Sequence, residues 1–265
     1  IMHPTMSKVP PFAFFGTPEI AVTVLNALHN AGYTPDVVIT NPDAPQGRKM
    51  VLTPSPVKVW ALAHAIPVLE PLSLRSDSRV YDYMKQHGLN LGVVVAYGKI
   101  IPESLLSLPH YGYINVHPSL LPRFRGASPI RSAILHDERD TGVSIMLLDR
   151  EVDHGPILAQ EQLTIREEEW PLRGRTLDQR LAEKGGELLC TVLPGYIEGD
   201  IIPQPQDHTK ATFCDKISKE MGELSLTDDP YHNLLKIRAF DGWPGTYFFT
   251  ERHGKRIRVK IVDAE

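Results

Sequence analysis

The sequence predicts an α/β fold with a doubly wound, mostly parallel sheet, and three observations support this. Short apolar runs over 12–15, 36–40 and 91–98 show no alternation of polar and apolar residues, which is typical of strands buried on both faces. Segments with helical periodicity separate these runs. Gly and Pro residues mark the boundaries between them. Strands and helices that alternate in this way are expected to form a sheet covered by helices on both sides.

The first half of the chain has the clearest boundaries. After the strand over 12–15, Thr17 is expected to cap a helix that has Pro18 at its first position and ends at Gly32. The next elements are expected to be a strand over 36–40, a Pro- and Gly-rich loop over 41–56, a helix around 57–65, a strand over 66–71, a helix over 76–87 and a strand over 91–98.

The second half continues the alternation and then becomes polar. A stretch rich in turn formers indicates a linker across the surface, and we expect a main domain over 7–205, a linker over 206–228 and a small C-terminal domain over 229–265. The elements are expected to be a strand that ends with Asn115 and His117, a strand over 141–149, a turn from Asp153 to Gly155, a strand over 156–165, a helix from about Leu177 to Tyr196, a helix over 229–240 and two strands joined through His253 and Gly254.

Composition limits the class of protein. The 265 residues, 42% of them hydrophobic, are enough for one large domain with a small appendage. The two cysteines, Cys190 and Cys214, are too few for a disulfide framework, so we expect a cytoplasmic protein. No apolar stretch approaches the roughly 20 residues that span a bilayer, and we expect no membrane partner. A net charge of -4 argues against a wholly basic nucleic-acid binder but allows a local basic patch.

Several common motifs do not fit this sequence. The turn "FFGTPE" has one glycine where a dinucleotide site needs GxGxxG, and "GVVVAYGKI" lacks the spacing and the Ser or Thr of a phosphate-binding loop. Neither HExxH nor a compact His, Cys and Asp cluster is present, so we expect no metal. The absence of GxSxG disfavours a serine hydrolase.

Asn115 and His117 are the first candidates for chemistry. Two residues apart on a strand, they point to the same side, and ligands of doubly wound sheets bind at the carboxyl ends of the strands. Taken alone, His117 is more simply a polar residue at a strand end, and Asp153 an ordinary turn aspartate.

The flanking motifs favour a catalytic interpretation. An Asn, a His two residues later and a distant Asp, here Asn115, His117 and Asp153, resemble the shared motif of the folate-dependent formyltransferases, a Rossmann-like family. The similarity is greater to the branch of that family that formylates methionyl-tRNA, and it extends over nearly the whole chain. The segments that carry it are "FFGTPEIAV", "PDAPQGR", "TPSPVK", "VVVAYGKIIPESLLSLP", "NVHPSLLPRFRGASPI", "GVSIMLLD", "ISKE" and "IRAFDGWPGTYF".

Formyl transfer would use these three residue types. The reaction from a folate nitrogen to an amine passes through a tetrahedral intermediate whose oxygen gains negative charge. The amide of Asn115 and a protonated His117 can donate hydrogen bonds to that oxygen. Asp153 would favour the protonated form of His117 and could help to accept the proton of the attacking amine.

The resemblance also implies the ligands and the residues that bind them. It implies 10-formyltetrahydrofolate as the co-substrate and initiator methionyl-tRNA, gripped by the loop over 41–56, as the acceptor in translation initiation. In this loop the sequence is less basic than the family, keeping only Arg48, Lys49 and nearby Lys58. The implied acceptor-binding residues are Arg48, Lys49, Arg123 and Arg125, of which the last two could equally be solvated loop charges. The implied folate-binding residues are Val95, Ala96, Tyr97, Gly98, Ser119, Leu120, Leu121, Pro122, Leu148, Asp149, Glu151 and Val152.

Some alternatives remain open at this point. Residues 229–265 correspond to the start of the family's C-terminal β-barrel, so we expect a truncated domain with a short β remnant, and tRNA recognition is less certain than formyl transfer. The acceptor could instead be an amino-sugar nucleotide or another small amine. A formyltetrahydrofolate hydrolase could use the same three residues with water, and a noncatalytic folate-binding relative is disfavoured because all three are present. We expect a monomer.

Overall fold

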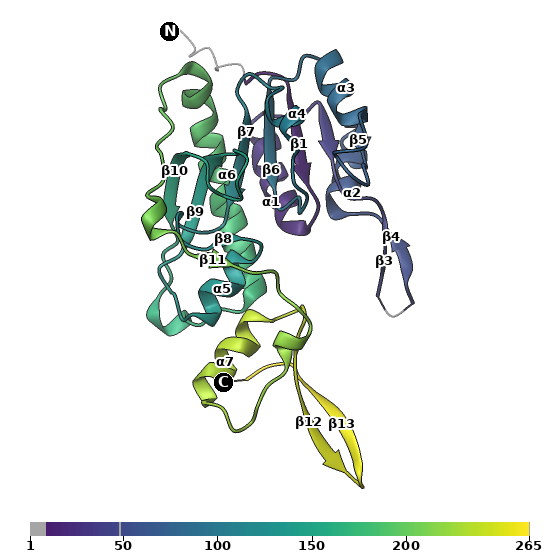
Figure 1. The fold of residues 1–265 in the computed structure, drawn as a ribbon, viewed down its shortest axis with the longest axis vertical. Coiled ribbons are helices and arrows are strands. Elements are labelled where there is room, and N and C mark those ends of the chain that lie inside the picture. The colour runs from purple at the N-terminus through teal and green to yellow at the C-terminus, as the bar shows by residue number, and fades with distance from the viewer. Residues whose placement is uncertain (1–8, 48, 265) are drawn as a thin grey trace. The chain divides into compact units, whose positions relative to one another are not determined.

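A seven-stranded sheet is the main element of the computed structural model, which describes residues 9–47 and 49–264. The strands are β1 (Phe12–Gly16), β2 (Val37–Ile39), β5 (Val68–Leu69), β6 (Leu91–Val95), β7 (Tyr113–His117), β9 (Gly142–Leu147) and β10 (Ile157–Gln162). They follow the order β10-β9-β7-β6-β1-β2-β5 (Figure 1). The chain runs from β1 outward to β2 and β5 and then returns to the other side of β1, which confirms the predicted doubly wound sheet.

Most neighbouring strands in the sheet are parallel. β1 pairs in parallel with β2 and β6, β2 with β5, and β6 with β7. β9 instead pairs antiparallel with β7, which places Ser144 opposite His117 and Met146 opposite Asn115. The sheet is therefore mostly parallel, as predicted. The antiparallel strand β9 lies beside β7, the strand that carries the candidate residues.

Helices connect the strands, as the periodicity predicted. α1 packs on β6, and α2 packs on β2 and β5. α6 approaches α1 closely at Gly186, where a Cβ would lie 2.7 Å from the Cβ of Ala27. The helices of this part of the chain are α1 (Glu19–Asn30), α2 (Pro56–Ala63), α3 (Arg79–Gln86), α4 (Glu103–Leu106) and α6 (Gly174–Glu198).

The predicted cap of α1 was wrong by one residue. Pro18 has an extended backbone, with ψ at 176°, so helical geometry starts at Glu19 and Pro18 is the N-cap. The hydroxyl of Thr17 therefore caps nothing, and it is buried without a hydrogen-bond partner among the described residues. α2 has a side-chain cap, because Ser55 Oγ accepts a hydrogen bond from Lys58 N at 3.1 Å.

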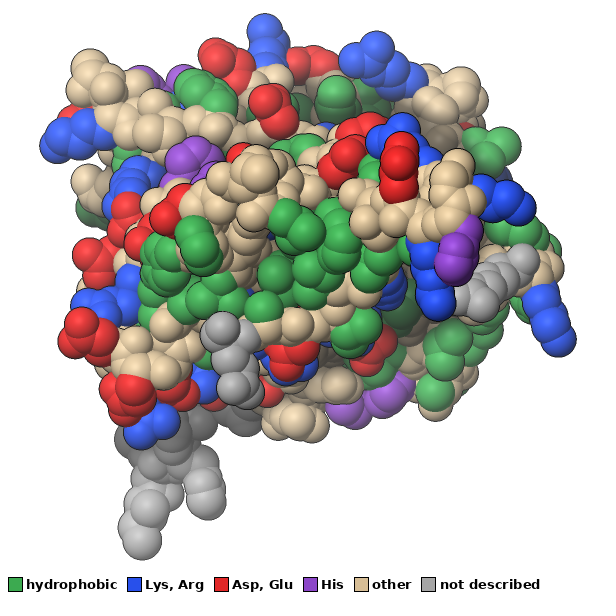
Figure 2. All heavy atoms as spheres, turned by 90° about the horizontal axis from the view of Figure 1, so that it is seen from below, with side chains coloured by type: hydrophobic (Ala, Val, Ile, Leu, Met, Phe, Trp, Pro, Cys, Tyr) green, Lys and Arg blue, Asp and Glu red, His purple; other side chains and the backbone are tan. Residues whose placement is uncertain are grey.

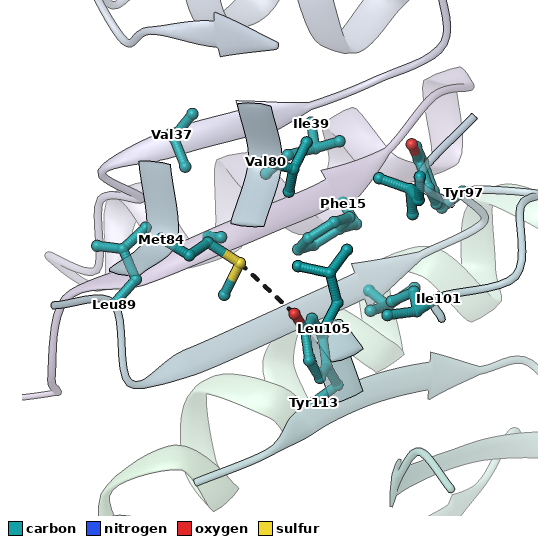
Figure 3. Close-up of a cluster of buried hydrophobic side chains, with 13 residues drawn as sticks. Phe15, Val37, Ile39, Val80, Met84, Leu89, Tyr97, Ile101, Leu105 and Tyr113 are labelled. Atoms are coloured by element: carbon teal, nitrogen blue, oxygen red, sulfur yellow. Dashed lines mark hydrogen bonds between the residues drawn. The ribbon is translucent and has the colours of Figure 1, made fainter. Parts of the chain in front are cut away.

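A buried cluster supports the sheet where β1, β2 and β6 lie side by side (Figure 3). Phe15 contacts the rings of Tyr97 and Tyr113 edge to face, with both centroids at 5.5 Å. Tyr113 Oη donates a hydrogen bond to Met84 Sδ at 3.5 Å, which satisfies a buried hydroxyl. The hydroxyl of Tyr97 lacks such a partner among the described residues, and burial raises the pKa of Tyr97 above its usual range, with a smaller contribution from Asp77.

The loop over 41–56 has more structure than predicted. It contains a hairpin of β3 (Ala44–Gln46) and β4 (Val51–Thr53), which pair antiparallel. Gly47 takes φ at 69° and Met50 φ at 49°, values that let the chain reverse within a few residues. The hairpin exposes the side chains of Met50, Val51 and Leu52.

The chain divides into two compact units. Unit 1 comprises residues 1–117, 144–161 and 182–206, and unit 2 comprises residues 118–143, 162–181 and 207–265. The domain boundaries predicted after residues 205 and 228 stay predictions. Unit 2 contains α5 (Pro129–Leu135), α7 (Pro230–Ala239), the strands β8 (Arg125–Gly126), β11 (Phe213–Cys214), β12 (Thr246–Arg252) and β13 (Lys255–Ile261), and the short 3₁₀ helices Glu167–Glu169, His208–Lys210 and Glu220–Gly222.

The segment predicted as a surface linker is partly buried. Within it, β11 pairs in parallel with β8, and Cys214, Ile217 and Leu224 are buried. The approach of β11 depends on Gly126, which has φ at 118° and where a Cβ would lie against the carbonyl oxygen of Cys214. The sequence did not predict this burial, because the segment is mostly polar and only a few of its residues are apolar.

The C-terminal hairpin has the predicted turn. β12 and β13 pair antiparallel, and the joining residues His253 and Gly254 have φ at 53° and 70°, as a two-residue hairpin turn requires. Guanidinium groups on this hairpin cover aromatic rings, with Arg258 at 3.4 Å from the centroid of Tyr247.

The surface carries both signs of charge. On the face in Figure 2, Lys and Arg side chains are interspersed with Asp and Glu, which agrees with the net charge of -4. In the described ranges, no helix is both long enough and apolar enough to cross a bilayer.

Candidate active site

Two side chains of β7 form the first part of the site. Asn115 and His117 lie two residues apart on the strand and so point to the same side. His117 is 4% exposed, whereas Asn115 is half-buried. Because Val94 lies opposite Asn115 in the register, His117 lies beside the segment that follows β6. The candidate residues are thus held by the most regular part of the fold.

Asp153 reaches this position through a turn. Because β9 is antiparallel to β7, the chain leaves β9 beside the start of β7, where Leu148 N donates to Tyr113 O at 2.8 Å. The turn that follows brings the carboxylate of Asp153 back along β7. Its Oδ1 accepts a hydrogen bond from Asn115 Nδ2 at 3.3 Å and lies 3.5 Å from His117 Nδ1. The structure therefore brings the three predicted residues together within unit 1.

The turn around Asp153 has an unusual backbone. Asp153 has φ at 50°, in the left-handed region that Asp tolerates better than most residues, and only 8% of its surface is exposed. His154 Nδ1 lies 2.6 Å from Asp149 Oδ2, and Leu147 N donates to Pro156 O at 2.9 Å, so both ends of the turn are tied. Gln206 Nε2 donates to the carbonyl oxygens of Asp153 and Gly155. The carboxylate thus comes from a constrained loop.

This arrangement presents hydrogen-bond donors next to a carboxylate. Since Nδ1 of His117 faces Asp153, Nε2 is the ring nitrogen turned toward the other side. Asn115 Nδ2 carries two hydrogens, of which Asp153 Oδ1 accepts one. Donors in such a buried setting can stabilise negative charge that develops on a substrate oxygen.

Gly155 is expected to tolerate no side chain. A Cβ at this position would lie against the carbonyl oxygen of Leu147, a backbone atom that cannot move without distorting β9. We expect Gly155→Ala to destabilise the fold by about 1–3 kcal/mol, measured as the free energy of unfolding in urea. Gly195→Ala is the matched control, because the three atoms nearest to its Cβ would be side-chain carbons, two of Ile201 at 3.2 Å and one of Asp200 at 4.0 Å. Equal urea midpoints for the two variants would contradict this packing argument.

The predicted folate segments in unit 1 differ in exposure. After β6, Ala96 and Gly98 have φ at 47° and 77°, both are exposed, and a Cβ at Gly98 would meet open space. Val95 and Tyr97 are buried, and Tyr97 O accepts a hydrogen bond from Asn41 Nδ2 at 3.3 Å. Backbone groups at the two exposed residues are therefore the accessible part of this segment.

The second predicted folate segment lies in the turn that carries Asp153. Leu148 and Asp149 are partly exposed, Glu151 is exposed, and Val152 shows 63% of its surface. Asp149 Oδ1 accepts a hydrogen bond from Glu151 N at 2.9 Å, which shapes the turn. An exposed apolar side chain beside polar groups suits contact with a planar heterocyclic ring.

The third predicted folate segment belongs to unit 2 and is mostly internal. Ser119 is 1% exposed, and its Oγ donates to Arg123 O at 2.6 Å. Leu121 is buried too, while Leu120 and Pro122 are partly exposed. The side chains of Ser119 and Leu121 therefore hold this loop in shape.

The basic residues in and near the predicted acceptor loop have different surroundings. Lys49 is exposed, and Arg48 lies outside the described residues. Lys58 Nζ instead lies 2.7 Å from Asp43 Oδ1 and 2.9 Å from Glu70 Oε2. The hydrogen bond from Lys58 to Asp43, and to a smaller extent the one to Glu70, raises the pKa of the Lys58 amine. Lys58 thus serves local structure, which spacing along the sequence could not reveal.

The two arginines after β7 have different surroundings in unit 2. Arg123 is partly exposed and pairs with Glu138. Arg125 is 3% exposed, and its guanidinium lies 2.8 Å from His208 Nδ1. The alternative that both are solvated loop charges is therefore wrong for Arg125. A role for either in binding an acceptor stays a prediction.

Residues suited to metal binding do not gather in the described part of the chain, where no three His, Cys, Asp or Glu side chains lie close enough to share an ion. The residue that sequence reasoning missed is Gln206. It lies in "IIPQPQD", whose prolines indicated a surface segment, yet it is 6% exposed. A Gln between a Pro and an Asp is common in polar segments, so the sequence gave no indication that this side chain is buried.

Comparisons with known proteins show which family the chain resembles. The family model described as formyl transferase matches residues 11–193. A methionyl-tRNA formyltransferase of Chloroflexus aurantiacus is 44% identical over 253 residues, which is 95% of this chain and 80% of that protein.

Solved structures show similarity of fold. A sugar N-formyltransferase from a Shewanella species has a TM-score of 0.70 at 19% identity, covering 97% of this chain and 99% of that one. HypX from Aquifex aeolicus, in complex with tetrahydrofolic acid, has a TM-score of 0.68 at 17% identity, covering 94% of this chain and 37% of that one.

Proposed function

The chain belongs to the formyl transferase family, and on this premise we propose that it transfers a formyl group from 10-formyltetrahydrofolate to the amino group of initiator methionyl-tRNA. The observation that carries the proposal is the 44% identity to a methionyl-tRNA formyltransferase over 95% of the chain. The geometry of Asn115, His117 and Asp153 supports the reaction type. In this interpretation the enzyme acts in translation initiation.

Asn115 and His117 are proposed to hold the formyl oxygen. Bound 10-formyltetrahydrofolate would supply the formyl carbon that the amine attacks. The second hydrogen of Asn115 Nδ2 and an N–H of the His117 ring would donate to the oxygen as its negative charge develops. Loss of one such donor typically costs about 10²- to 10³-fold in rate. The placement of both side chains within 3.5 Å of the Asp153 carboxylate supports this role.

Asp153 is proposed to balance charge and to assist proton removal. Its carboxylate lies 3.5 Å from His117 Nδ1, where it can orient the ring. This separation is at the long end of a hydrogen bond, and such contacts often tighten only when substrate is bound. The attacking amine must lose a proton, and the carboxylate is the nearby group of the site that can accept one.

The residues present fit a folate held mainly by backbone groups. Ala96 and Gly98 expose their backbone beside His117, and Val152 offers apolar surface from the turn that carries Asp153. Both segments belong to unit 1 and flank the same three residues. A folate contact from Ser119 to Pro122 stays a prediction, because these residues belong to unit 2.

The acceptor is proposed to bind through the β3–β4 hairpin. Lys49 on this hairpin is exposed, and Arg48 precedes it in the sequence. Their charges suit phosphate groups at the end of a tRNA. The exposed Met50, Val51 and Leu52 could cover the bases or ribose of that end.

The proposal predicts which acceptor is formylated. The purified protein is incubated with 10-formyltetrahydrofolate and with methionyl-tRNA, an amino-sugar nucleotide or no acceptor, and products are separated by mass. We expect formylmethionyl-tRNA as the main product, with a kcat/KM that falls as salt increases because phosphate contacts are screened. Rapid formylation of the sugar nucleotide without any formylmethionyl-tRNA would overturn the acceptor. Release of formate at the same rate without acceptor would indicate a hydrolase.

A further inference from the structure

Gln206 is a buried polar side chain that contacts the turn carrying Asp153. Its Nε2 donates to Asp153 O at 2.9 Å and to Gly155 O at 2.7 Å. The amide nitrogen of Gln has two hydrogens, so both bonds can form at once. With 6% of its surface exposed, the side chain lies inside the fold. It thus connects two residues on either side of His154.

The position of Gln206 is itself fixed by backbone pairing. Gln204 and Ile157 form an antiparallel bridge in which each N donates to the other's O at 2.8 Å. Ile157 is the first residue of β10, directly after the turn. The segment that follows α6 is therefore tied to the far end of the turn, and it places Gln206 over the carbonyl groups two residues later.

The turn depends on such support because its backbone is strained. A left-handed φ at a non-glycine residue persists only where the surroundings hold it, and Asp153 has φ at 50°. Gln206 bonds the carbonyl oxygen of Asp153 itself and so holds the peptide plane next to its Cα. The direction in which the carboxylate leaves the backbone follows from that plane. The carboxylate lies within 3.5 Å of both Asn115 Nδ2 and His117 Nδ1 only in this direction.

We propose that Gln206 is a positioning residue, which aims the carboxylate of Asp153 at Asn115 and His117 by holding the carbonyl groups of Asp153 and Gly155. Its catalytic consequence rests on the proposed formyl transfer, whereas its effect on the geometry does not. Gln suits this task because it is neutral and donates twice. Glu would place carboxylate oxygens against two carbonyl oxygens, and Met would fill the same space without donating.

The first test is structural and needs no substrate. A crystal structure of Gln206→Met, which keeps the volume of the side chain, is compared with that of the unchanged protein. We expect the turn to move and Asp153 Oδ1 to lie beyond hydrogen-bond distance of Asn115 Nδ2. A turn that stays in place would overturn the proposal, whatever reaction the protein catalyses.

The second test is kinetic. For Gln206→Met and Gln206→Glu, kcat with methionyl-tRNA is expected to fall by about tenfold to 10²-fold, as a displacement near 1 Å can cause, while both KM values change less than about threefold. Gln204→Glu is the matched control, since Gln204 is exposed and, among the described residues, its side chain donates a hydrogen bond only to Ile202 O. Changes in KM alone, or an equal loss in the control, would contradict a positioning role.

A double-mutant cycle separates positioning from general stability. If Gln206 acts through the carboxylate of Asp153, Gln206→Met should lower the rate of Asp153→Asn by less than about threefold, because the effects of coupled residues do not add. A full further loss would show that Gln206 acts elsewhere. An unchanged protein that formylates no methionyl-tRNA would refute the proposed function instead, and the crystal structures would still decide the role of Gln206.

Discussion

Replacement of His117 or Asn115 by alanine is expected to lower kcat for formyl transfer by about 10²- to 10³-fold. Each variant removes one donor from the oxygen that becomes negative, while the strand β7 that carries both residues keeps its backbone pairing with β6 and β9. Because these donors matter most in the transition state, KM for the folate should change little. Steady-state and single-turnover rates with methionyl-tRNA measure the loss.

His110→Ala serves as the control for these variants. His110 is an exposed histidine shortly before β7, and its ring contacts only Tyr111 among the ring contacts described. Its removal should leave kcat unchanged. Near-normal turnover of His117→Ala would show that the site described around β7 does not stabilise an oxyanion.

Asp153→Asn is expected to lower kcat by at least about 10²-fold, the usual contribution of a positioned proton acceptor. The substitution removes the negative charge beside His117 and keeps the shape of the side chain. An asparagine oxygen can still accept the hydrogen bond from Asn115, so the turn should stay folded and the melting temperature should change little. Single-turnover formylation at saturating folate measures the chemical step.

Asp149→Asn is the matched control in the same turn. Asp149 pairs with His154 at 2.6 Å and accepts a hydrogen bond from Glu151 N, but it does not contact Asn115 or His117. Because Asp149 is also a proposed folate-binding residue, KM for the folate is expected to rise, whereas kcat at saturating folate should stay within about threefold of normal. The change in stability should be small, since the contact with His154 is a partly exposed pair. If Asp153→Asn behaved like this control, Asp153 would be an ordinary turn residue.

The fold follows from local sequence in most of the sheet. The run over 91–98 predicts β6 because a strand covered on both faces needs apolar residues at every position, and β6 is buried throughout. The turn at His253 and Gly254 was predictable because few residues accept two successive positive φ values. That Asn115 and His117 lie on one side of a strand was also predictable from local sequence, because side chains alternate between the two sides of an extended backbone.

Local sequence gave no information on contacts between distant segments. Arg125 and Lys58 look like other basic residues in the sequence, and only folding places the first beside His208 and the second between two carboxylates. The cap of α1 and the hairpin in the 41–56 loop also differ from prediction. Both depend on particular backbone angles, ψ at Pro18 and φ at Gly47 and Met50, which the preferences of single residue types do not fix.

Sequence patterns alone predicted the sheet, most of the helices and the side of β7 on which Asn115 and His117 lie, because these depend on repeats of two and 3.6 residues that act over short distances. The contact of Asp153 with these two residues is visible only in the folded chain, as are the hydrogen bonds from Gln206, about fifty residues later, to the turn. The antiparallel pairing of β9 with β7 sends the chain past Tyr113 before it returns. Such convergence depends on packing across the whole chain, for which short-range periodicity carries no signal.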